Sequence, residues 1–131
     1  QPKILQTGEE EEFYPGEIED CILSILTDVL KNSDPKSRRS HILTDLLEHN
    51  AYQALSEQRK QEIKTLFKGY KSMSSAMRQT LQKLGFEISE DGSHYKLTYF
   101  GDPRYKTVIA KTGSDHREGK NITSVISKMM P

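Results

Sequence analysis

The sequence predicts an α+β protein in which a helical N-terminal subdomain precedes a C-terminal helix, a three-stranded antiparallel sheet and a last helix. Apolar residues recur at helical spacing up to residue 84 and again near the C-terminus, whereas apolar and polar residues alternate between these stretches. The 131 residues suffice for a small domain with a helical extension. We expect a flexible acidic lead-in over residues 1–16, a helical subdomain over 17–70 and an αβββα unit over 71–131.

The N-terminal subdomain is expected to hold three helices. The lead-in contains the run Glu9–Glu12 and no sustained apolar period. Apolar residues from Ile18 to Leu30 predict the first helix. Asp34–Pro35 suits the start of the second, because the carboxylate can cap free amides and proline at the first position loses no needed donor. The third is expected from Ser56, as its N-cap, to Gly69.

The C-terminal unit begins with a helix predicted over residues 72–84, which ends at Gly85. A short strand follows over residues 86–89, and Asp91–Gly92 is a turn signal. Residues 94–100 alternate as a second strand. On that strand, one face carries Tyr95, Leu97 and Tyr99, and the other carries His94, Lys96 and Thr98.

The third strand and the last helix complete this unit. Tyr105 to Ala110 is rich in residues that suit a pleated surface. After a polar loop, apolar residues from Ile122 to Met130 recur at helical spacing, and Asn121 is the expected cap.

Charge is distributed unevenly although the whole chain is neutral. Residues 1–34 carry nine acids and two bases, a net charge of −7, and residues 35–131 carry seventeen bases and ten acids, a net charge of +7. A basic body indicates phosphate or acidic partners. Cys21 is the only cysteine, so no internal disulfide can form, and we expect a cytoplasmic protein. No apolar run is long enough for a membrane span, and we expect no membrane partner.

Short motifs in the C-terminal unit resemble those of HicA-type toxins, small bacterial ribonucleases with a double-stranded-RNA-binding-like fold. The resemblance covers about residues 72–130 and leaves the N-terminal half unrecognised. The motifs are Leu84-Gly85-Phe86, Gly92-Ser93-His94-Tyr95, and Gly119-Lys120-Asn121 ahead of Ser124–Lys128. The resemblance implies that His94 is the catalytic residue of a metal-independent endoribonuclease.

Histidine suits RNA cleavage because it titrates near neutral pH and can take the 2′-hydroxyl proton without a metal. A partner acid is also needed, and His116 or Lys111 could supply it if the fold brings their loop beside His94. The alternative is that His94 is an exposed strand residue, and this alternative is favoured. We therefore expect binding rather than catalysis.

The leading expectation is a domain that binds RNA or another nucleic acid, as an accessory part of a larger bacterial protein. A helix start at Asn121, preceded by Gly119 and Lys120, would offer free amides and a cation to a phosphate. Only Phe100 or Tyr105 is expected to compete for a base-stacking role. The expected binding residues are Lys71, Arg78, Ser93, Lys96, Arg104, Lys106, Lys111, His116, Arg117, Lys120 and Asn121.

Two alternatives stay open beside nucleic-acid binding: a solvated face of scattered lysines, and a protein-interaction module whose partner is another protein or the rest of a longer chain. No cofactor or metal is expected. The glycine spacing from Gly113 to Lys120 does not fit a P-loop. His41, Asp45 and His49 share a helix face but offer only three ligands, so a polar face explains them better.

Overall fold

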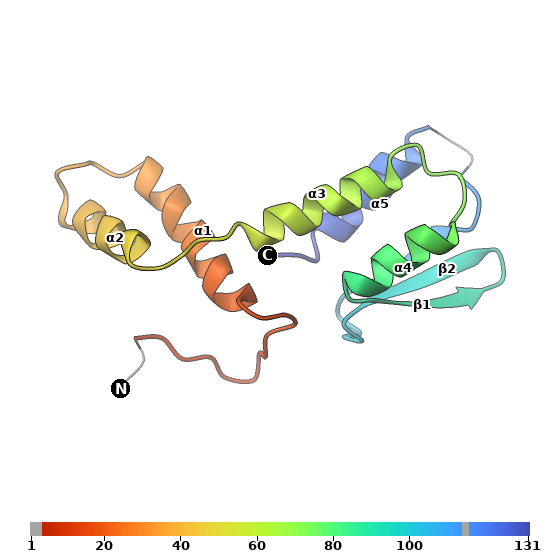
Figure 1. The fold of residues 1–131 in the computed structure, drawn as a ribbon, viewed down its shortest axis with the longest axis horizontal. Helices are drawn as coiled ribbons and strands as arrows, with labels where there is room; N and C mark the ends of the chain where they lie inside the picture. The colour runs from red at the N-terminus through yellow and green to blue at the C-terminus, as the bar shows by residue number, and fades with distance from the viewer. Residues whose placement is uncertain (1–3, 114–115) are drawn as a thin grey trace. The chain divides into compact units, whose positions relative to one another are not determined.

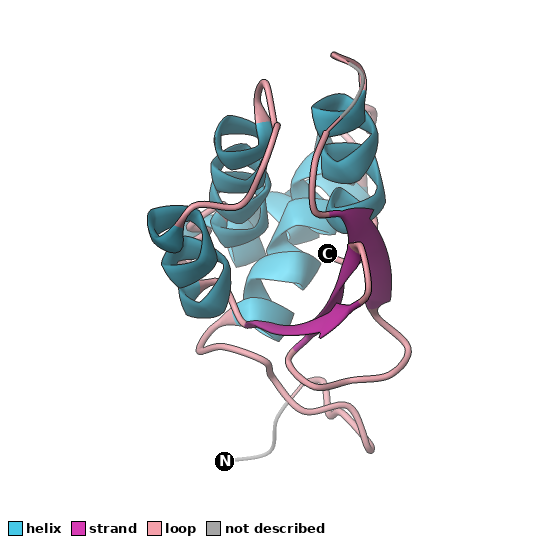
Figure 2. Cartoon of the chain, turned by 90° about the vertical axis from the view of Figure 1, so that its right-hand side faces the viewer, coloured by secondary structure: helices cyan, strands magenta, loops and turns pink. Residues whose placement is uncertain are grey.

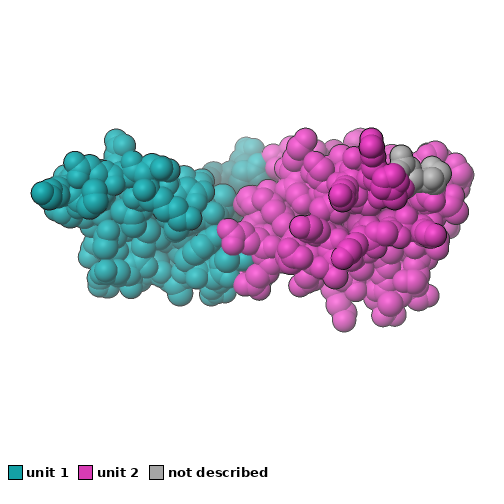
Figure 3. All heavy atoms as spheres, turned by 90° about the horizontal axis from the view of Figure 1, so that it is seen from above, with its two compact units in different colours: residues 1–54 teal, residues 55–131 magenta. Residues whose placement is uncertain are grey.

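The computed structural model describes residues 4–113 and 116–131, and it confirms the α+β class (Figure 1). The chain divides into two compact units, residues 1–54 (unit 1) and residues 55–131 (unit 2), which Figure 3 colours separately. The elements in chain order are α1 (Glu17–Lys31), α2 (Arg38–Glu48), α3 (Leu55–Phe67), α4 (Ser75–Lys83), β1 (Phe86–Asp91), β2 (His94–Tyr99), β3 (Lys106–Ala110) and α5 (Glu118–Ser127).

Unit 1 consists of α1 and α2, which contact each other, and the segments around them. Its buried apolar side chains are Leu23 and Leu43. The carboxylate of Asp20, a buried acid on α1, accepts a 2.8 Å hydrogen bond from the backbone N–H of Gln53. This bond ties the segment that leaves α2 back to α1.

The start of α2 differs from the expectation. Ser37, not Asp34, is the N-cap, and its hydroxyl accepts a 3.1 Å hydrogen bond from the backbone N–H of Ser40. Asp34 instead accepts from the backbone N–H of Lys36 at 2.9 Å. Asp34 and Pro35 therefore form a turn just before α2. An aspartate carboxylate can accept a hydrogen bond from the backbone N–H two residues further along the chain as readily as it can cap a helix.

Unit 2 is built on one antiparallel sheet with the order β1-β2-β3, drawn in magenta in Figure 2. Phe86 pairs with Tyr99 across β1 and β2, and Tyr95 pairs with Ile109 across β2 and β3. The predicted alternation along β2 is confirmed, because Leu97 and Tyr99 are buried while His94 and Lys96, on the other face, are exposed. Strand β1 continues to Asp91, two residues beyond the expected end, since the hairpin turn is only two residues long.

Helices cover the apolar face of this sheet: α4 contacts β1 and α5 contacts β3. Ser74 caps α4 by accepting a 3.1 Å hydrogen bond from the backbone N–H of Met77, so α4 is shorter than the sequence predicted. The buried apolar side chains of unit 2 are Ile63, Phe67, Tyr70, Met77, Leu81, Leu84, Phe86, Leu97, Tyr99, Ile109, Ile122, Ile126 and Met130.

Helix α3 lies in unit 2, whereas the sequence assigned it to the N-terminal subdomain with a boundary near residue 70. The structure divides the chain between Ala54 and Leu55. On α3, Arg59 donates hydrogen bonds to the Tyr99 hydroxyl, at 3.0 and 3.2 Å, and to the Leu84 carbonyl. Helix α3 also packs along α5. Its apolar face therefore completes the core of unit 2.

Helix α5 begins at Glu118, three residues before the expected cap. The backbone N–H of Asn121 donates a 3.0 Å hydrogen bond to the Arg117 carbonyl, so it is not a free amide at a helix start. Gly119 is buried against α3, where a Cβ would collide with the Phe67 carbonyl oxygen. Glycine thus permits the two backbones to meet. Part of the loop 113–117, residues 114 and 115, lies outside the described residues.

Candidate nucleic-acid interface

Unit 2 has two ends along the direction of its strands. One end, the hairpin end, holds the Gly92–Ser93 turn between β1 and β2, and the other, the far end, holds the loop from Phe100 to Tyr105 between β2 and β3. The six residues of β2 separate the two ends by roughly 17–20 Å. The expected binding residues are divided between these ends and the outer sheet face.

Three connections meet at the hairpin end (Figure 1). The backbone N–H of Lys111 donates to the Ser93 carbonyl at 2.9 Å, which joins the chain after β3 to the hairpin turn. The backbone N–H of Gly113 donates to the Lys71 carbonyl at 2.7 Å, and Ser72 and Thr112 form a β-bridge. Residues from the α3–α4 connection and from the chain after β3 therefore lie side by side.

The start of α5 adds further cations to the hairpin end. Because Gly119 lies against Phe67, the start of α5, which carries the exposed residues Arg117 and Lys120, meets the end of α3, which the exposed Lys68 follows. Lys68 was not among the binding residues expected from the sequence, because α3 was assigned to the other subdomain. We call the following set the basic end: Lys68, Lys71, Arg78, Lys111, Arg117 and Lys120.

The Tyr95 ring contacts two cations of the basic end. Its ring lies 5.4 Å from the guanidinium of Arg78, on α4, and 5.4 Å from the ammonium of Lys111. Both separations fall within the range of cation–π attraction. Glu90 forms a 3.1 Å ion pair with Lys111, and Glu118 lies between Arg117 and Lys120 at the start of α5, so two described acids lie within this group. The aromatic ring and the carboxylate hold Lys111 on the helix-covered side of the sheet.

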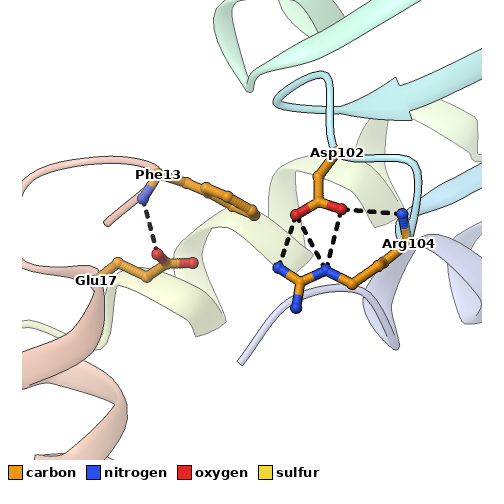
Figure 4. A network of polar contacts seen from close by, with 4 residues as sticks. All are labelled: Phe13, Glu17, Asp102 and Arg104. Carbon is orange, nitrogen blue, oxygen red and sulfur yellow. Dashed lines mark hydrogen bonds and ion pairs between the residues drawn. The ribbon is translucent and has the colours of Figure 1, made fainter. Parts of the chain in front are cut away.

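The far end holds Arg104 and Lys106, which the structure separates from the basic end. Arg104 donates several hydrogen bonds to the Asp102 carboxylate, the shortest at 2.7 Å (Figure 4). These bonds hold the pKa of Asp102 below its usual value. The charge of Arg104 is therefore opposed by an adjacent carboxylate, and this loop is a weaker phosphate site than its sequence suggested. A separate hydrogen bond in the same view, unrelated to the far end, runs from the Phe13 backbone N–H to the Glu17 carboxylate within unit 1.

The outer face of the sheet is exposed and of mixed charge. Lys96 and Lys106 alternate on it with Glu87 and Asp91, and Val108 at its edge is 59% exposed. Opposite charges at close spacing reduce the attraction of this face for phosphates. Lys96 therefore lies outside the basic end.

His94 occupies this outer face beside the hairpin turn. The Ser93 hydroxyl lies 3.2 Å from His94 Nδ1, and Asp91 is its cross-strand neighbour. Ala110 is the partner of His94 on β3, so Lys111, the next residue, points to the other side, where it meets Tyr95. Lys111 is thus not placed to act as the acid that a His94-dependent cleavage would need. His116 is exposed in the loop before α5.

No aromatic ring lies on the outer face of the strands, whose residues are Glu87, Ser89, Asp91, His94, Lys96, Thr98, Lys106, Val108 and Ala110. Phe100, at a φ of 50°, packs its ring over Gly85 and 4.8 Å from the Tyr99 ring. Tyr105 lies under Arg104, 5.1 Å from its guanidinium. Both expected stacking residues are therefore engaged within the protein.

Within the part of the chain that the structure describes, no group of three His, Cys, Asp or Glu side chains is arranged to hold a metal ion. His49 bonds to the Asp45 carbonyl oxygen at 2.7 Å, which raises the histidine pKa. A groove between α3 and α4 is lined by residues that include Thr65, Leu66 and Met77, but not by His94.

None of the described helices is both long enough and apolar enough to cross a membrane. Comparisons of the chain with protein-family models, with curated proteins and with solved structures yielded no significant match. The function is therefore argued from the geometry and charge of unit 2.

Proposed function

We propose that unit 2 binds RNA through the basic end. The observation that carries the proposal is the convergence of cations from four segments, namely the end of α3, helix α4, the chain after β3 and the start of α5. Phosphates attract clustered lysines and arginines more strongly than scattered ones, because their potentials add over a Debye length of about 8 Å.

The overall charge of unit 2 supports this role. Residues 55–131 contain fourteen Lys and Arg against eight Asp and Glu, a net charge of +6. The acids Glu87 and Asp91 are on the outer sheet face and Asp102 is at the far end, whereas Glu90 and Glu118 lie among the cations of the basic end. The six cations of the basic end therefore outnumber the two described acids among them, which leaves that end with a net positive charge.

The absence of an aromatic ring on the outer face of the strands favours a duplex over a single strand. Proteins that bind single strands stack bases on exposed aromatic side chains. In unit 2 the rings of Phe100 and Tyr105 are engaged within the protein. Contacts with the phosphates of a helical RNA require no such platform.

The test is a titration of the 131-residue chain with a short RNA duplex at two salt concentrations. One variant changes three exposed residues of the basic end, Lys68→Gln, Lys71→Gln and Lys120→Gln. The matched control makes the same charge change at exposed positions toward the far end, with Lys83→Gln, Lys106→Gln and Lys128→Gln.

We expect the first variant to bind more weakly. Its salt dependence should fall by about one unit in log–log slope for each phosphate that the variant no longer neutralises. The control should keep most of the affinity and slope. Equal losses of affinity in both variants would mean that net charge alone drives binding, and undiminished binding in the first would reject the basic end as the site.

Cleavage is scored in the same titration, in the presence of a chelator, by the length of the recovered RNA. We expect the RNA to stay intact, because Lys111 lies on the other face of the sheet from His94. Cleavage that disappears in His94→Ala would establish the ribonuclease instead.

A further inference from the structure

Helix α1 carries one broad apolar face that can be divided into two adjoining stripes. One contains Leu23, Leu26 and Leu30, and the other contains Ile18, Ile22, Ile25 and Val29. At 3.6 residues per turn their centres are roughly 100° apart around the helix. Leu23 is only 4% exposed, whereas Ile25 is 56% and Val29 is 40% exposed. The second stripe, which we call the β-branched stripe, is therefore exposed at Ile25 and Val29 and half-buried at Ile18 and Ile22, whereas the leucine stripe is buried at Leu23 and half-buried at Leu26 and Leu30.

The β-branched stripe has the spacing of a coiled-coil seam. Its members follow one another after four, three and four residues, which are the a and d positions of a heptad. The fifteen residues of α1 extend over roughly 22 Å. A surface of this period and length fits a second α-helix better than a strand or a loop.

The charge of unit 1 indicates what kind of helix could bind the β-branched stripe. Residues 1–54 hold eleven Asp and Glu against five Lys and Arg, a net charge of −6. Glu19 and Asp28, both exposed, occupy the e and g positions that border the seam, and Asp28 also forms a 3.9 Å surface ion pair with Lys31. A second copy of the chain would bring the same negative charge to a seam only about two heptads long, so self-association is disfavoured. A basic helix would be attracted.

We propose that the β-branched stripe of α1 is a docking site for a basic amphipathic helix of a partner protein. The partner lays an apolar seam against Ile25 and Val29 and directs lysines or arginines toward Glu19 and Asp28. This inference is independent of RNA binding, because it concerns unit 1 and no residue of the basic end.

The probe is a synthetic three-heptad peptide with isoleucine and leucine at a and d and lysine at e and g. A matched peptide carries glutamate at e and g. Both are titrated by calorimetry against the 131-residue chain and against the Ile25→Ala, Val29→Ala double variant. Alanine favours helix more than either residue it replaces, so the double variant should keep α1. Val108→Ala with Val125→Ala, at positions 59% and 44% exposed in unit 2, is the control.

We expect the lysine peptide to bind the parent chain, and to bind the α1 double variant about tenfold more weakly or worse, because apolar area leaves the interface. The control variant should bind as the parent does, and the glutamate peptide should not bind. No binding of the lysine peptide, equal binding to the α1 variant, or equal binding of the glutamate peptide would each overturn the proposal. Sedimentation that shows self-association of the parent chain, abolished in the α1 variant, would overturn it in favour of a second copy.

Discussion

Units 1 and 2 differ in how much of their apolar surface they bury. Of the fifteen buried apolar side chains among the described residues, thirteen belong to unit 2 and only Leu23 and Leu43 belong to unit 1. Ile25, Val29 and Ile42 of unit 1 are each at least 40% exposed. Unit 2 therefore has a core of its own, whereas unit 1 leaves apolar surface uncovered.

The difference has a simple physical origin. Two helices enclose little volume, while a sheet with helices on one face encloses a layer that excludes water on all sides. The charges of the units are also opposite, −6 in unit 1 and +6 in unit 2. These differences favour phosphate binding by unit 2 and contact with another protein by unit 1.

The largest expected effect tests whether unit 2 holds the core. Leu97→Ala removes a side chain with 0% exposure at the centre of the sheet and should lower the free energy of unfolding by about 2–5 kcal/mol. Ile25→Ala, at an exposed position of unit 1, should change it by less than about 0.5 kcal/mol. Urea unfolding followed by circular dichroism gives both values. Similar losses of unfolding free energy from Leu97→Ala and Ile25→Ala would contradict the claim that unit 2 holds the core.

The second prediction tests the assignment of α3 to unit 2. Arg59→Met keeps the length of the side chain but leaves the Tyr99 hydroxyl and the Leu84 carbonyl without this donor, at a cost of about 1–3 kcal/mol. Native-state hydrogen exchange should show the loss of stability in the strands of unit 2. Tyr99→Phe should lower the free energy of unfolding by less in the Arg59→Met background than it does alone. A loss of protection confined to α1 and α2 would instead return α3 to the N-terminal subdomain.

The smallest effect compares the same capping interaction in both units. Ser37 caps α2 and Ser74 caps α4, each through a 3.1 Å hydrogen bond from a backbone amide. Replacing either with alanine should cost about 1 kcal/mol. Hydrogen exchange in unit 2 should respond to Ser74→Ala and not to Ser37→Ala if the units unfold separately. An equal response of unit 2 to both would show that the units unfold together.

Local sequence signals predicted most of the elements of unit 2. The alternation along β2 placed Leu97 and Tyr99 on the buried face correctly, because a strand turns successive side chains to opposite sides. The turn signal at Asp91–Gly92 located the hairpin to within one residue, because Asp91 still pairs with His94 and the turn is Gly92–Ser93. Helix starts were less accurate, since several serines and aspartates near each start can all cap, and the surrounding packing selects among them.

The sequence anticipated the members of the basic end, the proposed site, only in part. Lys71, Arg78, Lys111, Arg117 and Lys120 were expected and lie at the basic end, but sequence alone could not separate them from Arg104, which the Asp102 carboxylate engages at the far end. Lys68 was missed because its helix was assigned to another subdomain. The sheet register turns Lys111 away from His94, which argues against the partner-acid role suggested for Lys111.

The sequence by itself determined the α+β class, the three strands and the separation of acidic from basic charge, since each depends on residues close together in the chain. Only the tertiary structure decided that α3 belongs with the sheet and that cations from four segments gather at one end. Those outcomes depend on contacts between distant residues, such as Arg59 with Tyr99 and Gly119 with Phe67, and local periodicity carries no information about such contacts.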